Sequence, residues 1–126
     1  MFLIVLLGPP GCGKGTQSNK IMQDFDVNYL CVGDILRNKI ASDEELKTMM
    51  SQGKLLDSSY INNLVDQEIA KINNNKVILL DGYPRKLDQA EHIDQNNQVH
   101  VIYFELDKQT LIDRIDSRYS CGDCLE

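Results

Sequence analysis

A glycine-rich loop near the start of the chain has the residue types that bind phosphate groups. It reads Gly-Pro-Pro-Gly-Cys-Gly-Lys-Gly-Thr over residues 8–16, between an apolar run and a helical pattern. Glycines let successive backbone N–H groups converge on an anion, and a following helix adds the positive end of its dipole. A lysine in this place can reach the β- and γ-phosphates of a nucleotide. The residues that we expect to bind phosphate are Gly11, Cys12, Gly13, Lys14, Gly15 and Thr16.

The residue after Lys14 departs from the usual form of such a loop. A Ser or Thr normally stands there as a direct ligand of Mg²⁺, whereas this chain has Gly15, so we do not expect a hydroxyl to coordinate the metal. Asp81 ends a buried apolar run and is the better candidate for holding Mg²⁺, directly or through water. Asp34 is a second candidate, and either carboxylate could instead cap the helix that follows it.

The arginines form a second group with phosphate chemistry. The chain has four of them against nine lysines. Arg37 and Arg85 each follow the carboxyl end of a predicted strand, where ligands bind in open α/β sheets, and Arg114 and Arg118 lie one helical turn apart. The planar guanidinium donates two parallel hydrogen bonds to phosphate oxygens. For any one arginine, a surface ion pair is the alternative interpretation.

Apolar runs and helical stripes alternate along the chain and predict the elements that position these side chains. The predicted strands are Phe2–Leu7, about Asn28–Val32, Val77–Leu80 and Val99–Leu106. Continuous apolar runs such as Phe2–Leu7 and Val77–Leu80 are typical of strands buried on both faces, whereas Val99–Leu106 shows some alternation of apolar and polar residues. The chain therefore predicts an α/β fold, a doubly wound parallel sheet with helices on both faces.

Between the strands, apolar spacing predicts the helices. One follows the loop and carries Ile21, Met22 and Phe25, one runs from about Ile61 to Ile72 before the turn Asn73–Asn75, and one covers Lys86 to about His92. Short helical pieces between Gly33 and about Asp57, with Gly53 as a stop signal, predict a small inserted subdomain. Asp107 is the predicted N-cap of a last helix with Leu111, Ile112 and Ile115.

The composition excludes several classes of partner. A net charge of −6 over 126 residues argues against a general grip on nucleic acid, which needs a basic face. The run Phe2–Leu7 is too short for a membrane helix and lacks the basic start of a signal peptide, so no membrane association is expected. With its four scattered cysteines, the chain is expected in a reducing, cytoplasmic setting.

Taken in order, these blocks resemble the adenylate kinase family within the nucleoside monophosphate kinases. The matching segments are Gly8-Pro-Pro-Gly-Cys-Gly-Lys-Gly-Thr-Gln17, Gly33-Asp-Ile-Leu-Arg37, Gly53-Lys-Leu-Leu56, Leu80-Asp-Gly-Tyr-Pro-Arg85 with Gln89, and Asp113-Arg-Ile-Asp-Ser-Arg118. The resemblance covers essentially the whole chain. It implies one P-loop kinase domain over residues 1–126, with a core at 1–32 and 58–118, a monophosphate-binding insertion at 33–57 and the start of a lid at 119–126.

The resemblance also implies a role for each site residue. Lys14, Arg85 and Arg118 would be catalytic, Arg114 would stack on the ATP base, and Asp81 would hold Mg²⁺ through water. The residues implied for AMP are Val32, Arg37, Leu56, Gly82, Arg85 and Gln89, with Gln89 reading the adenine. The family usually has Ser or Thr where Val32 stands, so acceptor affinity or selectivity is expected to differ.

Cys121 and Cys124 resemble the first half of the four-ligand zinc knuckle found in many bacterial lids of this family. A Cys-x-x-Cys pair supplies only half of a tetrahedral site, so the alternative is two unligated thiols. His92 and His100 show no ligand or base spacing and are interpreted as structural.

The reaction implied is reversible phosphoryl transfer from Mg-ATP to AMP giving two ADP, by a monomer. The resemblance further implies that the chain is C-terminally incomplete, with a truncated lid, and that its own catalysis is weak. The alternatives are a pyrimidine nucleoside monophosphate kinase and a nucleotide-binding fragment without turnover.

Overall fold

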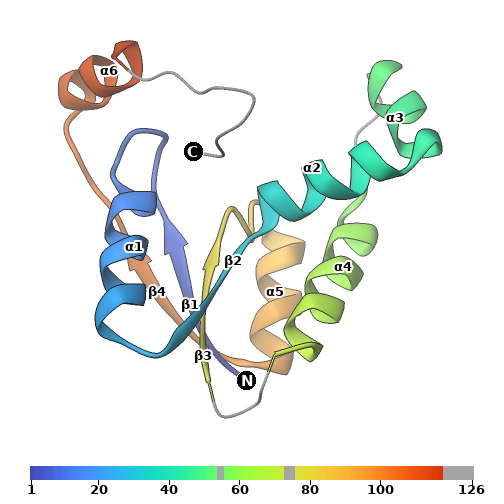
Figure 1. The fold of residues 1–126 in the computed structure, drawn as a ribbon, viewed down its shortest axis with the longest axis horizontal. Coiled ribbons are helices and arrows are strands. Elements are labelled where there is room, and N and C mark those ends of the chain that lie inside the picture. The colour runs from blue at the N-terminus through green and yellow to red at the C-terminus, as the bar shows by residue number, and fades with distance from the viewer. Residues whose placement is uncertain (54–55, 73–75, 118–126) are drawn as a thin grey trace.

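The computed structural model describes residues 1–53, 56–72 and 76–117 of the chain. Its strands are β1 (Phe2–Leu7), β2 (Val27–Cys31), β3 (Val77–Asp81) and β4 (Gln98–Tyr103). They form one sheet in the order β2-β3-β1-β4, and every pair is parallel (Figure 1). The predicted α/β class with a parallel sheet is confirmed.

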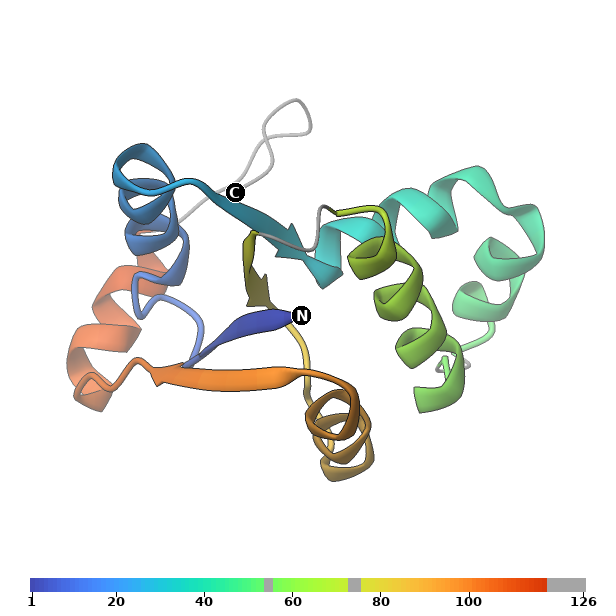
Figure 2. The same cartoon turned by 90° about the horizontal axis from the view of Figure 1, so that it is seen from below.

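Helices connect the strands and lie on both faces of the sheet. They are α1 (Lys14–Asp24), α2 (Val32–Ser42), α3 (Glu44–Ser51), α4 (Ser58–Ala70), α5 (Leu87–Asn96) and α6 (Lys108–Asp116). Figures 1 and 2 show α1 on one side of the sheet and α4 with α5 on the other. This arrangement is the doubly wound one predicted from the alternation of strands and helices.

The hydrophobic core lies between β1, β3 and the helices on the α4 and α5 side. Leu3 is paired in register with Ile78, and Val5 with Leu80, so these four side chains point to the same face. They pack with Val32, Val65, Ile69, Tyr83 and Ile93. Since the middle residues of β1 and β3 are buried, the carboxyl ends of these strands are held in fixed relative positions.

The strand order places a switch point between β1 and β3. The chain leaving β1 passes through α1 to β2, beyond β3, whereas the chain leaving β3 passes through α5 to β4 on the other side of β1. The connections after β1 and β3 therefore diverge. In sheets of this kind the crevice between such diverging connections is where ligands bind.

Helices α2 and α3 extend away from the sheet (Figures 1 and 2). Asp43 caps α3 by accepting from the backbone N–H groups of Glu45 and Leu46. Gly53 follows the end of α3 with φ of 76° and donates to Met50, as the stop signal predicted. The division of the chain into a core, an insertion at 33–57 and a lid from 119 stays a prediction, and 119–126 lies outside the described residues.

Several predicted element boundaries were wrong, including the end of β2, because Val32 is already the first residue of α2. Helix α1 ends at Asp24, so Phe25 is an exposed C-cap residue rather than part of the helix. Strand β4 ends at Tyr103 instead of Leu106, because the last backbone bond, from Phe104 N to Leu7 O, is made where β1 itself ends. Helix α5 continues past His92 to Asn96.

Strand β4 forms the edge of the sheet as far as the structure describes it. Val101 and Tyr103 are 56% and 65% exposed, and Ile102 is also exposed. The alternation predicted for this strand therefore does not give one buried and one exposed face, because side chains on both faces are exposed. Among the described residues, no helix is both long and apolar enough to cross a bilayer.

Candidate phosphate-binding site

The glycine-rich loop connects β1 to α1 and is shaped by two glycines. Gly11 and Gly13 have φ of 82° and 97°, a region that other residues rarely adopt. Gly13 is also the N-cap of α1, and it makes no side-chain hydrogen bond to the helix. The N-cap residue thus supplies no side chain to the first N–H groups of α1, which is the arrangement that suits a phosphate at a helix N-terminus.

Gly8 sets how closely the loop lies against the sheet. A Cβ atom at Gly8 would be 2.7 Å from Cys12 Sγ and 2.8 Å from Phe104 Cβ, so only glycine fits. Cys12 itself is buried. This burial favours a small loop residue over a reactive nucleophile at this position.

Lys14 is directed back over the loop. Its Nζ donates to the carbonyl oxygen of Gly8 at 2.9 Å and lies 3.8 Å from Asp81 Oδ1. The lysine and aspartate side chains are 24% and 13% exposed. The ammonium group therefore stands between the loop and the end of β3, where anionic ligands and metal-bound water could both reach it.

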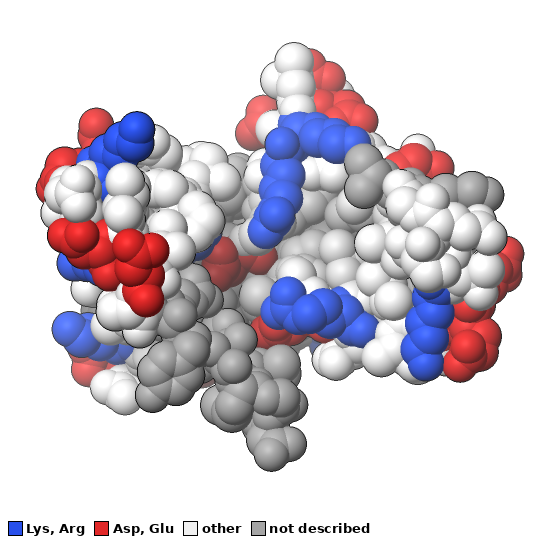
Figure 3. Space-filling model, turned by 90° about the horizontal axis from the view of Figure 1, so that it is seen from above, with Lys and Arg blue, Asp and Glu red and all other residues white. Residues whose placement is uncertain are grey.

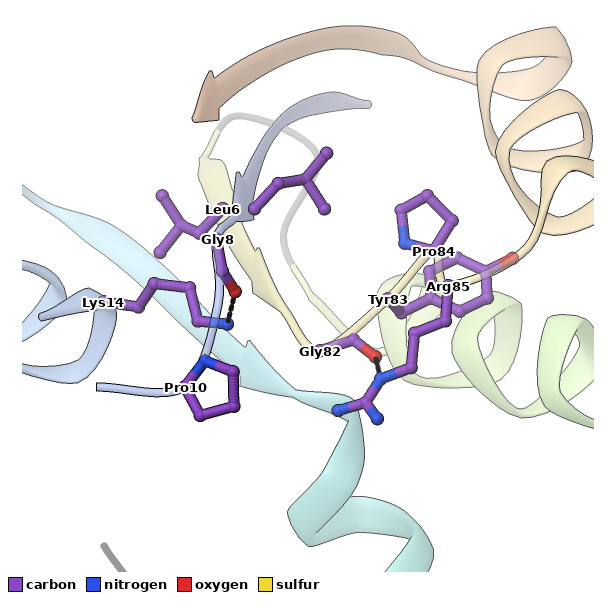
Figure 4. Close-up of a pocket in the computed structure, with 9 residues that line it drawn as sticks. Leu6, Gly8, Pro10, Lys14, Gly82, Tyr83, Pro84 and Arg85 are labelled. Atoms are coloured by element: carbon purple, nitrogen blue, oxygen red, sulfur yellow. Dashed lines mark hydrogen bonds between the residues drawn. The ribbon is translucent and has the colours of Figure 1, made fainter. Parts of the chain in front are cut away.

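A pocket of about 240 Å³ opens at the carboxyl ends of β1 and β3. It lies at the switch point of the sheet, where the neighbouring strands β1 and β3 end. Lys14 and Arg85 extend toward this space from opposite sides (Figure 4). The lining residues are Leu6, Leu7, Gly8, Pro10, Lys14, Gly82, Tyr83, Pro84 and Arg85.

Arg85 is held by its own turn and by α5. Its Nε donates to the carbonyl oxygen of Gly82 at 2.9 Å, and its backbone N–H donates to Gln89 Oε1 at 2.8 Å. Gln89 is 3% exposed, and its amide nitrogen lies 3.5 Å from Ser58 Oγ. In the structure Gln89 thus supports the backbone of Arg85, a contact that the sequence did not reveal.

Gly82 brings the end of β3 against the start of α2. It has φ of 82°, and a Cβ there would lie 3.6 Å from the backbone nitrogen of Gly33. Val32, next to Gly33, is 2% exposed and belongs to the core. Arg37 on the same helix forms an ion pair with Asp34. The alternative in which Asp34 caps this helix is wrong, because α2 begins at Val32 and its N-cap is Cys31.

Arg114 connects α6 to the loop. Its Nη1 donates to the carbonyl oxygen of Gly11 at 3.2 Å. A Cβ at Gly11 would also lie 3.2 Å from Ile115 Cγ1. Helix α6 begins at its predicted N-cap, Asp107, which accepts from the Thr110 backbone N–H at 2.9 Å.

The charges agree with an anion-binding surface. Figure 3 looks down on the carboxyl ends of the strands and shows Lys and Arg side chains bordering the central hollow. The structure thus brings three of the predicted cations, Lys14, Arg85 and Arg114, to the loop and the pocket. Arg37 lies on α2 beside Gly33.

Tyr29 is a site residue that the sequence analysis missed. Its hydroxyl donates to Asp81 Oδ2 at 2.6 Å. Burial and the neighbouring Asp81 carboxylate raise the pKa of Tyr29 far above its ordinary value, so the phenol keeps its proton. This contact depends on the register with which β2 pairs with β3, and the sequence alone does not reveal that register.

Tyr83 fixes the wall of the pocket. Its hydroxyl donates to Asn62 Oδ1 on α4 and lies 3.4 Å from the carbonyl oxygen of Gln89 on α5. Burial, followed by the charges of Asp66 and Asp88, raises the pKa of Tyr83 to about 12. The turn before Arg85 is therefore tied to both helices of this face.

The donor set at the site suits Mg²⁺ better than a transition metal. Within the described ranges, no three His, Cys, Asp or Glu side chains gather as a metal cage. Mg²⁺ is commonly held by one or two carboxylates together with waters and substrate phosphates, which fits Asp81 beside Lys14. Cys121 and Cys124, predicted as half of a zinc site, and Arg118 lie outside the described residues.

Some predicted site residues do not line the pocket. Gly15 and Thr16 lie exposed in the first turn of α1, and Leu56 is half-buried just before α4. His92 contacts Asp66 at 2.8 Å and so joins α5 to α4, in agreement with a structural role. His100 stacks on Phe2 at 4.7 Å between ring centres.

Comparison with known proteins points to one family. A family profile described as "Adenylate kinase" matches residues 6–124. The chain is 38% identical to an adenylate kinase of Thermoanaerobacter sp. (strain X514), over 96% of this chain and 60% of that protein. It is 36% identical to an adenylate kinase of Rickettsia prowazekii (strain Madrid E), over 97% of this chain and 61% of that protein.

A third relative, an adenylate kinase of Caldanaerobacter subterraneus subsp. tengcongensis, is 39% identical over 96% of this chain and 59% of its own length. The chain thus spans about 60% of the length of the curated relatives that it matches. Since the family profile and these relatives cover nearly all of the chain, and its fold and phosphate loop agree with them, the chain belongs to the adenylate kinase family.

Proposed function

We propose that this protein transfers a phosphoryl group reversibly from Mg-ATP to AMP, giving two ADP. The observation that carries the proposal is the pairing of Lys14 and Arg85 across one pocket at the switch point of the sheet. One cation comes from the phosphate loop after β1, and the other from the turn after β3. Two phosphate-binding groups on separate elements can hold a donor and an acceptor phosphate in one place.

Each residue has a role in this proposal. The N–H groups of the loop and Lys14 hold the β- and γ-phosphates of ATP, and Arg85 neutralises charge on the transferring group. Arg114, on the loop side, faces the ATP base, while Arg37 and Gln89 serve AMP. Arg118 is assigned to phosphate oxygens, and Gly82 and Leu56 to the acceptor side. We further propose that the protein acts as a monomer in the cytoplasm.

Asp81 would hold Mg²⁺ through water when the metal is bound, and the metal would supply charge neutralisation at the phosphate oxygens. The transfer needs no protein nucleophile. The chain instead aligns two phosphates, places positive charge where negative charge develops, and keeps water away from the transferring group. The pocket wall of Leu6, Tyr83 and Pro84 supports the last of these tasks.

The phosphate loop is tested by nucleotide binding. Lys14→Ala should abolish ATP binding measured by isothermal titration calorimetry, because it removes the cation above the loop. Lys20→Ala is the matched control, since Lys20 is an exposed lysine of the same helix. Unchanged ATP affinity in Lys14→Ala would refute the role given to the loop.

The acceptor is tested by a coupled assay of ADP formation from ATP with AMP, UMP or CMP. The proposal expects AMP to be the best acceptor. UMP and CMP are included because of one specific observation. Val32 presents a buried apolar side chain where the family usually has a hydroxyl. A preference for UMP or CMP would replace the proposed acceptor, and ATP binding without turnover for any acceptor would favour a nucleotide-binding fragment.

A further inference from the structure

We infer that Tyr29 is a positioning residue for Asp81, holding one carboxylate oxygen so that the other faces the phosphate loop and Mg²⁺-bound water. The inference rests on the proposed function and deepens it, because it assigns a task to a residue outside the loop and outside the arginine set. Tyr29 lies on β2, two strands away from the strand that leads into the loop.

The sheet register explains how the two residues meet. Tyr29 is paired with Leu79 on the parallel neighbour β3, and Asp81 lies two residues further toward the carboxyl end. Side chains two residues apart on one strand point to the same face, separated by roughly 6.6 Å along it. A tyrosine side chain is long enough to cover that diagonal, and its hydroxyl lies 2.6 Å from Asp81 Oδ2.

The two oxygens of Asp81 have different partners. Oδ2 accepts from the Tyr29 hydroxyl, whereas Oδ1 lies 3.8 Å from Lys14 Nζ. The longer distance leaves Oδ1 without a close donor from the lysine. A carboxylate fixed through one oxygen loses rotational freedom, and the other oxygen is aimed at the cation side of the site.

Supporting groups of this kind affect metal affinity. Residues that hydrogen-bond a metal-binding carboxylate fix its orientation, and their removal costs metal sites on the order of 10- to 100-fold in affinity. The site offers one carboxylate from β3, so its orientation carries more weight than in a cage of several ligands. The nearest alternative is a purely structural hydrogen bond between β2 and β3.

The test compares ATP affinity with Mg²⁺ and with EDTA, by calorimetry on the full chain. Tyr29→Phe removes only the hydroxyl, and we expect it to reduce the gain in ATP affinity from Mg²⁺ by on the order of 10-fold. Affinity in EDTA should stay as in the unmodified chain. Tyr103→Phe is the matched control, since that tyrosine is exposed on β4.

A double-mutant cycle with Asp81→Asn separates positioning from other effects. If Tyr29 acts through the carboxylate, Tyr29→Phe has no further effect on the Mg²⁺ gain once Asp81→Asn is present. Independent, additive losses would overturn the inference. Thermal unfolding confirms that each variant is folded, and Tyr29→Met, of similar length without a hydroxyl, replaces the Phe variant if that one unfolds.

The remaining outcomes are also decisive. An unchanged Mg²⁺ gain in folded Tyr29→Phe overturns the inference and leaves the proposed function intact. An equal loss of affinity in Mg²⁺ and in EDTA assigns Tyr29 a structural role and overturns it as well. Failure of the unmodified chain to bind ATP refutes the proposed function, and the inference with it.

Discussion

Arg114 Nη1 donates to the carbonyl oxygen of Gly11 at 3.2 Å, so helix α6 contacts the phosphate loop across a separation of 103 positions. The same nitrogen would lie 3.8 Å from a Cβ at Gly13. The contact joins a surface helix to the two glycines whose positive φ angles shape the loop. It places a guanidinium at the edge of the loop.

Arg114→Ala should weaken ATP binding on the order of 10-fold, because a charge-assisted hydrogen bond to the loop and a cation near it are both lost. Stability should change little, since the residue is exposed. Calorimetry with ATP measures the effect, and Lys108→Ala, an exposed cation of the same helix, is the control. Equal ATP affinities for the two variants would contradict the role of Arg114.

Gly8→Ala should destabilise the protein by about 1–3 kcal/mol, the usual cost of overpacking. The added Cβ would meet Phe104 Cβ at 2.8 Å and the Phe104 backbone oxygen at 3.0 Å, and neither atom can move aside by a rotamer change. Chemical denaturation without nucleotide measures this loss.

Gly15→Ala is the matched comparison for Gly8→Ala. A Cβ at Gly15 meets no atom within 4 Å, and the residue lies in helix α1. Alanine is favoured over glycine in helices by about 0.5–1 kcal/mol, so this variant should be neutral or more stable. A similar loss of stability in both variants would show that steric crowding at Gly8 is not the cause.

The elements that the sequence predicted well are those whose signals are local. The apolar run of β1, the glycine-rich loop and the Asp107 cap each depend on residues that are neighbours in the chain. The end of β4 could not be predicted in this way, because it depends on where β1 ends. The end of α5 was missed because its last turn is polar, and Asn96 and Asn97 bond to helix carbonyls instead.

The candidate site was also predicted only in part, because only some of its contacts follow from local sequence signals. The positions of Lys14 and Arg85 follow from their motifs and from the rule that parallel strands present their carboxyl ends together. The contact of Tyr29 with Asp81 depends on the pairing of β2 with β3, which no local pattern encodes. Nor does spacing reveal that the Gln89 oxygen accepts from the Arg85 backbone.

Helix α6 should lose its cap in acid. Hydrogen bonds from the Thr110 hydroxyl, and then from its backbone N–H, hold the pKa of Asp107 below its ordinary value of 3.8. A lowered pKa in the folded state means that the cap contributes stability above the ordinary value and loses it as the pH falls through the folded value. Protonation should therefore fray α6 and release Arg114 from the loop.

The Asp107 titration can be followed by NMR of the side-chain carboxyl carbon. Thr110→Val removes the hydroxyl donor, which lies 2.6 Å from Asp107 Oδ2, and should move the pKa of Asp107 up toward 3.8. Gln109→Ala is the control, because the Gln109 side chain donates to Asp113 instead. An unchanged Asp107 titration in Thr110→Val would contradict the assigned cause.

Gly82→Ala should destabilise the protein by about 1–2 kcal/mol, the cost of the left-handed region for an L residue, since Gly82 has φ of 82°. The strain falls on the turn whose carbonyl oxygen accepts from Arg85 Nε. We therefore expect a lower unfolding free energy in urea, together with weaker nucleotide binding as the Arg85 anchor shifts.

Gly33→Ala distinguishes two possible causes of a loss at Gly82: strain in the Gly82 backbone, and crowding between the β3 turn and the start of α2. Gly33 is helical, and the atoms nearest to a Cβ there would be those of the Arg37 guanidinium, at 3.4 Å or more. This flexible side chain can move, so the variant should keep or gain stability. If Gly33→Ala lost as much stability as Gly82→Ala, the close approach of α2 to the β3 turn would be the cause. If Gly82→Ala lost none, the positive φ would not be required by the fold.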